Sequence, residues 1–97
     1  MSAIREGLRF AAVHPALPGH FPGKPVVAGV LLLDRAAAAI QREWQLRVTG
    51  IPRMKFVRPL PPETDAELQL ARLGNEVRVR IVADGETIAS GTLEASA

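Results

Sequence analysis

The segment from Pro15 to Ile40 constrains the fold of this chain more than any other part of the sequence. Residues 15–25 hold four prolines and two glycines, and residues 26–40 then form the most apolar run in the chain. Because proline fixes φ and has no N–H donor, residues 15–25 are incompatible with a helix or a central strand. The pattern predicts an ordered loop with a shape of its own, followed at once by a buried element.

The apolar run has the composition of a helix. Three leucines at 31–33, four alanines at 36–39 and Ile40 have mostly high helix propensity, and the pattern predicts a helix from Val27 to Gln45. Its apolar residues surround most of the circumference, so the helix must be buried on several sides. A chain of 97 residues has few other elements to cover it. The pattern therefore favours a second subunit.

The remaining segments have the alternating pattern of β-strands. A weak alternation predicts a first strand over residues 8–14, and only residues 95–97 are expected to fray. Four strands are predicted after the helix, over residues 48–58, 66–73, 77–81 and 86–93. They are separated by the proline-rich segment 59–62, a turn at 73–75 and the hairpin dipeptide Asp84-Gly85. This order predicts one α+β domain over residues 1–97, in which a curved antiparallel sheet with a four-strand meander wraps around one long helix.

Composition excludes several classes of function. The chain has no cysteine, which rules out disulfides, thiolate zinc sites and a cysteine nucleophile. A net charge of +2 and an aromatic content of 4% give little support to nucleic-acid binding. The first residues contain no apolar stretch of signal-peptide length, and the run at 26–40 is too short to span a membrane. We expect a protein of the cytoplasm.

Three residues in or beside the apolar helix are candidates for a functional site. Asp34 interrupts the apolar run, where a carboxylate is costly to bury unless it is paired or protonated; it also suits a polar edge, or a pair with an arginine. His20 lies in the proline loop, and together with a carboxylate it would make a general acid–base pair. Gly29 lies near the first helical turn, where free backbone N–H groups can bind a ligand carbonyl. Close packing explains this glycine equally well, and spacing leaves both explanations open.

The sixteen-residue stretch from Gly19 to Asp34 resembles the signature of the hotdog-fold 3-hydroxyacyl-acyl-carrier-protein dehydratases. The family's G-H-F-P-G loop is present, His20 and Asp34 keep the interval between its histidine and its acidic residue, and Gly29 matches its helix-start glycine. Residues 54–60 (MKFVRPL) resemble the family's K-F-x-R-P strand, and residues 62–64 resemble the turn that follows it. The resemblance covers nearly the whole chain.

The resemblance implies a hotdog fold, a dimer with paired sheets and shared active sites, and a 3-hydroxyacyl substrate on the phosphopantetheine thioester of an acyl carrier protein. It implies that His20 removes the C2 proton, that Asp34 helps the C3 hydroxyl leave as water, and that the N–H of Gly29 polarises the thioester carbonyl. Phe21 and Val30, the neighbours of His20 and Gly29, are expected to contact the substrate. No metal or redox cofactor is implied.

The sequence departs from the family pattern in four respects. The family proline before the helix glycine is Ala28, and the acid is Asp, as in isomerising relatives, in place of Glu. The family glutamine one helical turn after the acid is Ala38, which removes a side chain that can orient the acid. The chain also lacks the family's long N-terminal segment, which brings it nearer to the small dehydratases of aryl-polyene and xanthomonadin-like pigment clusters.

Three functions fit these observations. The first is dehydration of a 3-hydroxyacyl-acyl-carrier-protein to the trans-2-enoyl form in fatty acid, polyene or pigment-type chain synthesis. The second is a hotdog thioesterase in which a helix carboxylate activates water, although such enzymes do not need His20. The third is a non-catalytic hotdog subunit that binds a carrier protein or an active homologue, which Ala38 keeps open.

An acidic carrier protein is the expected partner. It would dock on basic residues near the mouth of the substrate tunnel, for which the candidates are Lys24, Arg53, Lys55 and Arg58. Ordinary solvated charges are the alternative interpretation of these four residues. Acyl chain length and an aryl or aliphatic substrate are not decided by the sequence.

Overall fold

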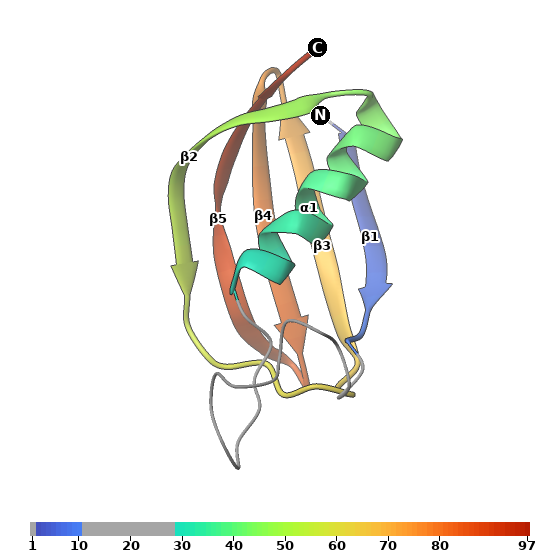
Figure 1. Ribbon diagram of the computed structural model, residues 1–97, viewed down its shortest axis with the longest axis vertical. Helices are drawn as coiled ribbons and strands as arrows, with labels where there is room; N and C mark the ends of the chain where they lie inside the picture. The colour runs from blue at the N-terminus through green and yellow to red at the C-terminus, as the bar shows by residue number, and fades with distance from the viewer. Residues whose placement is uncertain (1, 11–28) are drawn as a thin grey trace.

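The computed structural model describes residues 2–10 and 29–97, which form one helix and five strands (Figure 1). The elements are β1 (Ser2–Leu8), α1 (Gly29–Trp44), β2 (Arg47–Phe56), β3 (Ala66–Leu73), β4 (Glu76–Ala83) and β5 (Glu86–Ser96). All pairings are antiparallel, and the strands of the described sheet run in the order β1-β3-β4-β5-β2. β1 and β2 are therefore the two edges of the sheet.

The core lies between α1 and one face of the sheet, across which the helix runs in Figure 1. In β4, the buried residues Val77, Val79 and Ile81 alternate with exposed charged residues, as expected for a strand with one covered face. In α1, the buried residues are Leu32, Ala36, Ala39 and Ile40, which form one stripe with helical spacing. The two small alanines in this stripe let the helix backbone lie close to the sheet.

The end of α1 is tied to the edge strand β1 by an ion pair. The guanidinium of Arg42 donates a hydrogen bond to Oε1 of Glu6, and this bond raises the pKa of Arg42 above its ordinary value. A cation in the last turn also lies beside the negative end of the helix dipole. The contact orients the last turn toward β1.

The prediction of a strand over residues 8–14 was wrong in its boundaries. β1 ends at Leu8, and its register with β3 runs from Ser2 opposite Arg72 to Leu8 opposite Ala66. The limits of β1 follow from its pairing with β3. The local alternation of apolar residues, which suggested a later start, does not determine them. Residues 11–14 lie outside the described residues.

The four-strand meander was also wrong, because only β3, β4 and β5 follow one another in space. β2 lies on the far side of β5, with Lys55 opposite Ser90 and Phe56 opposite Ala89. The connection over residues 57–65 contains three prolines, and Leu60 within it is buried in the core. Prolines lack the N–H groups that a ladder needs, so this segment leaves the sheet and does not form a hairpin with β3.

The turns predicted at 73–75 and at Asp84-Gly85 are both present. The prediction that residues 95–97 fray was wrong for residues 95 and 96, which belong to β5. Asp84 and Gly85 both have positive φ, 52° and 74°, as a type I′ hairpin turn requires. β5 continues to Ser96; Ala95 is 1% exposed, and its N–H donates to the carbonyl of Asn75 at 2.8 Å. The last strand is therefore held by its neighbours β4 and β2 almost to the end of the chain.

Candidate functional site

A cavity of about 440 Å³ lies at the start of α1. The helix contributes Gly29 and Leu32, and the other wall is the segment Phe56–Leu60 at the end of β2. The start of α1 meets the end of β2 here, and β2 is one of the two edge strands of the sheet. The cavity is lined mainly by apolar side chains, as small-molecule sites commonly are.

Gly29 packs against the Phe56 ring of the opposite wall. A Cβ atom at this position would lie 2.8 Å from Cζ and 3.0 Å from Cε1 of the Phe56 ring. The packing explanation for this glycine is therefore supported. The same position is the first residue of α1, where backbone N–H groups lack intrahelical acceptors and the helix dipole is positive. The first turn contains no acidic side chain that could accept hydrogen bonds from these N–H groups. They can therefore donate to a carbonyl oxygen that enters the cavity.

Asp34 lies on a different face of α1. Val30, Asp34 and Ala38 follow one another at intervals of four residues, and all three are exposed in the single chain. We call these residues the open stripe. Asp34 forms no hydrogen bond or ion pair with any other residue in the ranges 2–10 and 29–97. Within one chain Asp34 therefore lies on a polar edge of the helix, which is one of the alternatives that the sequence left open.

An arginine partner for Asp34 was the alternative, and it is not observed among the described side chains. The neighbouring Arg35 instead places its guanidinium over the ring of Phe10, 5.2 Å from the centroid. α1 therefore has one stripe covered by its own sheet and a second stripe open. This agrees with a helix that needs more cover than one small sheet provides.

The structure brings only part of the predicted site together. Gly29 borders the cavity, whereas Val30 and Asp34 are not among its lining residues. Along the helix axis Asp34 is about 7.5 Å from Gly29, at the standard rise per residue. His20, Phe21 and Lys24 lie outside the described residues, so the predicted pairing of His20 with Asp34 stays a prediction.

The basic docking candidates are divided between two places. Arg58 borders the cavity and forms an ion pair with Glu86, with 2.8 Å between Nε and Oε2. Arg53 and Lys55 alternate in β2 with Met54, which packs on the core, and with Phe56, which contacts Gly29. Their side chains therefore lie on the face of the sheet away from α1.

Sequence reasoning assigned no role to Phe56 or Leu60, although both line the cavity. Phe56 is one of only three phenylalanines in the chain, and it is 47% exposed. Its place beside the helix start follows from the packing of β2 against Gly29, which no local sequence pattern shows. Leu60 carries no comparable signal, because its position depends on how residues 57–65 leave the sheet.

The described residues contain neither a membrane-spanning helix nor a metal-binding cluster. No helix in the ranges 2–10 and 29–97 has the length and hydropathy that a membrane crossing requires. In the same ranges, no three histidine, aspartate or glutamate side chains are grouped in a way that would hold a metal ion.

Comparison with known families gives a match over most of the chain. The model of the ApeI-like family, described as ApeI dehydratase, matches residues 2–92. Relatives described as 3-hydroxyacyl-acyl-carrier-protein dehydratase FabZ occur in Acetivibrio thermocellus, Herpetosiphon aurantiacus and Thermus thermophilus. They are 33%, 31% and 36% identical over 82%, 93% and 81% of this chain, and over 64%, 78% and 66% of their own lengths. The chain thus spans less than two thirds of the Acetivibrio and Thermus relatives.

Solved structures with low sequence identity share the fold. The dehydratase heterocomplex ApeI:P from Xenorhabdus doucetiae has a TM-score of 0.88 at 21% identity, over 98% of this chain and 88% of that one. The R-hydratase PhaJ1 from Pseudomonas aeruginosa has a TM-score of 0.76 at 16% identity, over 99% and 79%. A mutant of the fluoroacetyl-CoA-specific thioesterase FlK has a TM-score of 0.66 at 15% identity, over 98% and 84%. Together with the five-stranded antiparallel sheet and its helix, these likenesses confirm an α+β hotdog fold.

Proposed function

Because this chain belongs to the ApeI-like dehydratase family, we propose that it dehydrates a 3-hydroxyacyl thioester on an acyl carrier protein to the trans-2-enoyl thioester. The match over residues 2–92 carries this proposal. The dehydratase descriptions of relatives more than 30% identical support it. The cavity beside the start of α1 supports it chemically, since the free N–H groups there suit a thioester carbonyl that gains negative charge during the reaction.

The proposed reaction is an acid–base elimination. The imidazole of His20 accepts the proton from C2, and the electron pair of that C–H bond forms the C2–C3 double bond. The C3–O bond breaks, and the carboxyl of Asp34 donates the proton with which the hydroxyl leaves as water. The N–H of Gly29 donates to the thioester oxygen while C2 loses its proton. The proton taken by His20 then replaces the one lost by Asp34, so the enzyme returns to its starting state.

A second subunit would complete this site. A carboxyl group acts as a general acid at neutral pH when apolar cover keeps it protonated, and Asp34 lies on the open stripe of α1. β2 is an uncovered edge strand, and Ile51, Phe56 and Val57 on or next to it are 52%, 47% and 49% exposed. Exposed apolar edges promote strand pairing between chains. We propose a two-fold dimer joined at β2, in which α1 becomes the central enclosed helix and His20 of one subunit meets Asp34 of the other.

The acyl carrier protein is the proposed partner in the reaction. Of the four basic candidates, Arg58 borders the cavity, and Lys24 is close in sequence to His20. An acidic surface that docks beside Arg58 would compete with Glu86 for its guanidinium. The phosphopantetheine arm would arrive with the substrate, and the proposed chemistry needs no further cofactor.

A non-catalytic subunit is the second candidate, and Ala38 favours it. Ala38 lies on the open stripe one turn beyond Asp34, so no side chain at that position can orient the carboxyl. The solved ApeI:P dehydratase is described as a heterocomplex. In this alternative, the β2 edge of the present chain would pair with a different hotdog chain that supplies the activity.

An assay with 3-hydroxydecanoyl-carrier protein and shorter and longer homologues separates the candidates. We expect absorbance from the conjugated enoyl thioester, with no release of free thiol. Release of thiol would indicate a thioesterase, a function that the shared fold of FlK permits. Absence of both signals across chain lengths, in a protein shown to be folded, would contradict the dehydratase and favour the non-catalytic subunit.

A further inference from the structure

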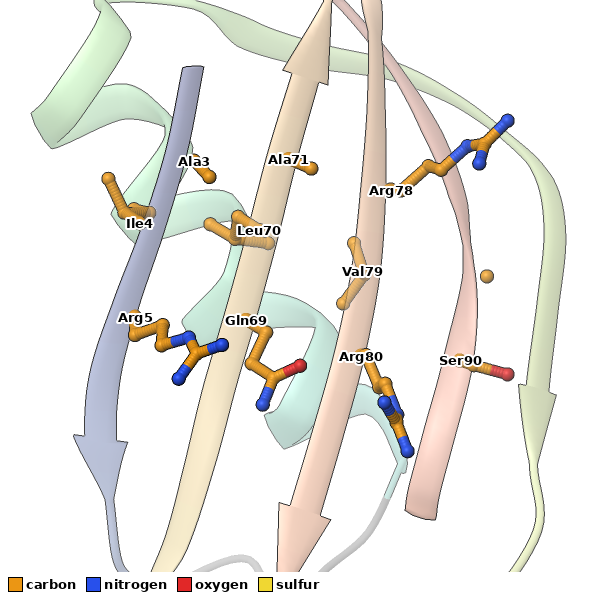
Figure 2. Close-up of a pocket in the computed structure, with 11 residues that line it drawn as sticks. Ala3, Ile4, Arg5, Gln69, Leu70, Ala71, Arg78, Val79, Arg80 and Ser90 are labelled. Atoms are coloured by element: carbon orange, nitrogen blue, oxygen red, sulfur yellow. The ribbon is translucent and has the colours of Figure 1, made fainter. Parts of the chain in front are cut away.

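A second cavity lies on the face of the sheet away from α1. It has a volume of about 390 Å³ and is formed by the middle parts of β1, β3, β4 and β5. We call it the outer hollow. Its labelled residues are drawn in Figure 2, where α1 lies behind the strands. It is lined by Ala3, Ile4, Arg5, Gln69, Leu70, Ala71, Arg78, Val79, Arg80, Ser90 and Gly91.

Small residues create the depth of this hollow. Ala3 is paired with Ala71, and Ala71 is paired with Arg78, so two methyl groups adjoin where larger side chains would fill the surface. Leu70, Val79 and Gly91 are paired with one another across the sheet, and their row faces the core, where Leu70 and Val79 are each 2% exposed. The apolar floor of the outer hollow is therefore made by the methyl groups of Ala3 and Ala71, and the sheet itself separates it from the α1 side.

One row of paired residues provides its polar rim. Arg5 is opposite Gln69, Gln69 is opposite Arg80, and Arg80 is opposite Ser90. Because paired Cα atoms are about 5 Å apart, Arg5 and Arg80 flank Gln69 at about 10 Å from each other. Figure 2 shows these three side chains on the neighbouring strands β1, β3 and β4. Two guanidinium groups at this separation can reach one anion lying over the Gln69 amide.

Existing hydrogen bonds hold this row in place and leave donors free. Nε of Arg80 donates to Oγ1 of Thr87 at 3.1 Å, which leaves both of its terminal amino groups available. Nε2 of Gln69 donates one hydrogen to Glu67 at 2.8 Å and keeps a second one. Arg5 has no ion-pair partner in the part of the chain that the structure describes. Paired guanidinium groups are well suited to a carboxylate, which they bind through two parallel hydrogen bonds.

The surrounding charge favours an anion. The lining contains three arginines and no acidic residue, and the same two rows continue on β2 with Lys55 opposite Ser90 and Arg53 opposite Thr92. Of these five cations, only Arg78 has an ion-pair partner in the described chain, Glu76 at 3.9 Å, although Glu67 lies beside Gln69. Such a cluster is costly to its own stability unless a counter-charge is bound nearby.

We propose that the outer hollow binds an amphipathic carboxylate, with the head group between Arg5 and Arg80 and a single apolar chain over Ala3 and Ala71. The apolar floor distinguishes this ligand from a free inorganic anion, and the guanidinium pair distinguishes it from a neutral lipid. The ligand class is an aliphatic or aromatic monocarboxylate. Its binding does not depend on the reaction proposed above.

The test is a titration of isotope-labelled protein with sodium decanoate, followed by the NMR shifts of backbone amides. We expect saturable shifts at Gln69, Ala71 and Arg80. Arg80→Gln and Ala71→Leu, which fills the hollow, should each weaken this binding about tenfold, the loss expected when one strong contact is removed. Arg47→Gln removes the same charge from an exposed position at the start of β2 and should leave the affinity unchanged. The amide spectrum of each variant reports whether it is folded.

Three results would overturn the proposal. Shifts confined to Gly29, Phe56 and Leu60 would place decanoate in the cavity at the start of α1 only. Equal binding of decan-1-ol at the Gln69 and Arg80 amides would show that the arginines do not recognise an anion. Equal binding of inorganic phosphate there would show a simple anion site in which the apolar floor plays no part.

Discussion

The ring of Phe56 occupies the space that a side chain on Gly29 would need, since a Cβ atom there would lie 2.8 Å from Cζ of the ring. The helix start and the end of β2 are therefore matched to each other across the cavity. Phe56 is 47% exposed, so the ring can move if it is pushed, but the shape of the cavity then changes. A single pair of residues thus couples the strand edge to the proposed carbonyl site.

We expect Gly29→Ala to lower kcat/KM about tenfold or more while the protein remains folded. The methyl group displaces the Phe56 ring, and a misplaced donor loses stabilisation of the developing charge. Steady-state kinetics with 3-hydroxyacyl-carrier protein measures the loss. Gly7→Ala is the matched control, because nothing lies within 4 Å of a Cβ at that position. A double variant with Phe56→Leu should recover part of the activity, and equal loss in the single and double variants would contradict the steric explanation.

His20→Ala and Asp34→Asn are each expected to lower the dehydration rate by roughly 10²–10⁴-fold, as is typical for general acid–base groups. Because Asp34 forms no hydrogen bond or ion pair with other described side chains, its loss should leave thermal unfolding nearly unchanged. Glu43→Gln removes another exposed carboxylate from α1 and should retain wild-type rates. Full activity of either site variant would refute the roles assigned to these two residues.

Mixing two inactive variants tests whether sites are shared between subunits. When His20→Ala and Asp34→Ala chains are unfolded together and refolded, random pairing gives mixed dimers in which one site has both groups intact. We expect about a quarter of the wild-type activity to return. Native mass spectrometry confirms that mixed dimers are present. If they form and activity stays absent, each site is built within one subunit.

Ile51→Lys is expected to shift the protein from dimer to monomer in sedimentation velocity. Ile51 is 52% exposed on the edge strand β2, and a lysine there must be desolvated when two edges pair. Leu73→Lys is the control, since Leu73 is 62% exposed at the end of β3 and far from β2 in the strand order. A variant that remains dimeric would place the interface elsewhere.

Gly91→Ala should destabilise the fold by about 1–3 kcal/mol, the usual cost of overpacking. A Cβ at Gly91 would lie 2.3 Å from the carbonyl oxygen of Arg53 and 2.8 Å from Cα of Met54, and neither backbone atom can move without disturbing the β2–β5 pairing. Denaturant unfolding measures the change. Gly7→Ala again serves as the control, and an unfolding free energy unchanged by both substitutions would show that β2 yields easily at Arg53.

The sequence predicts those parts of the fold that depend on neighbouring residues. The end of the helix, the strand at 66–73 and the turn at Asp84-Gly85 follow from propensity, alternation and turn chemistry, and they agree with the structure to within one residue. The place of β2 beyond β5 and the ordering of Ala95 depend on pairing between distant segments, which no local pattern contains.

The candidate site was predictable to a similar extent. Gly29 and Asp34 were identified from one helix, and the structure places both on α1. The Gly29–Phe56 contact joins residues that are distant in sequence, so periodicity does not predict it. The exposure of Asp34 agrees with the polar edge that the sequence left open beside a buried carboxylate and an arginine pair, between which local order alone does not decide.

The position of β2 beside β5 has a consequence for the order of folding. β3, β4 and β5 follow one another in the chain and can pair through short loops, whereas β2 has no strand to join until β5 has formed. Pairings between distant segments slow folding, because a long loop must close before the contact stabilises it. We therefore infer that the hairpins of the C-terminal half form first. The edge that carries Phe56, and with it the wall of the cavity at Gly29, would be completed only after them.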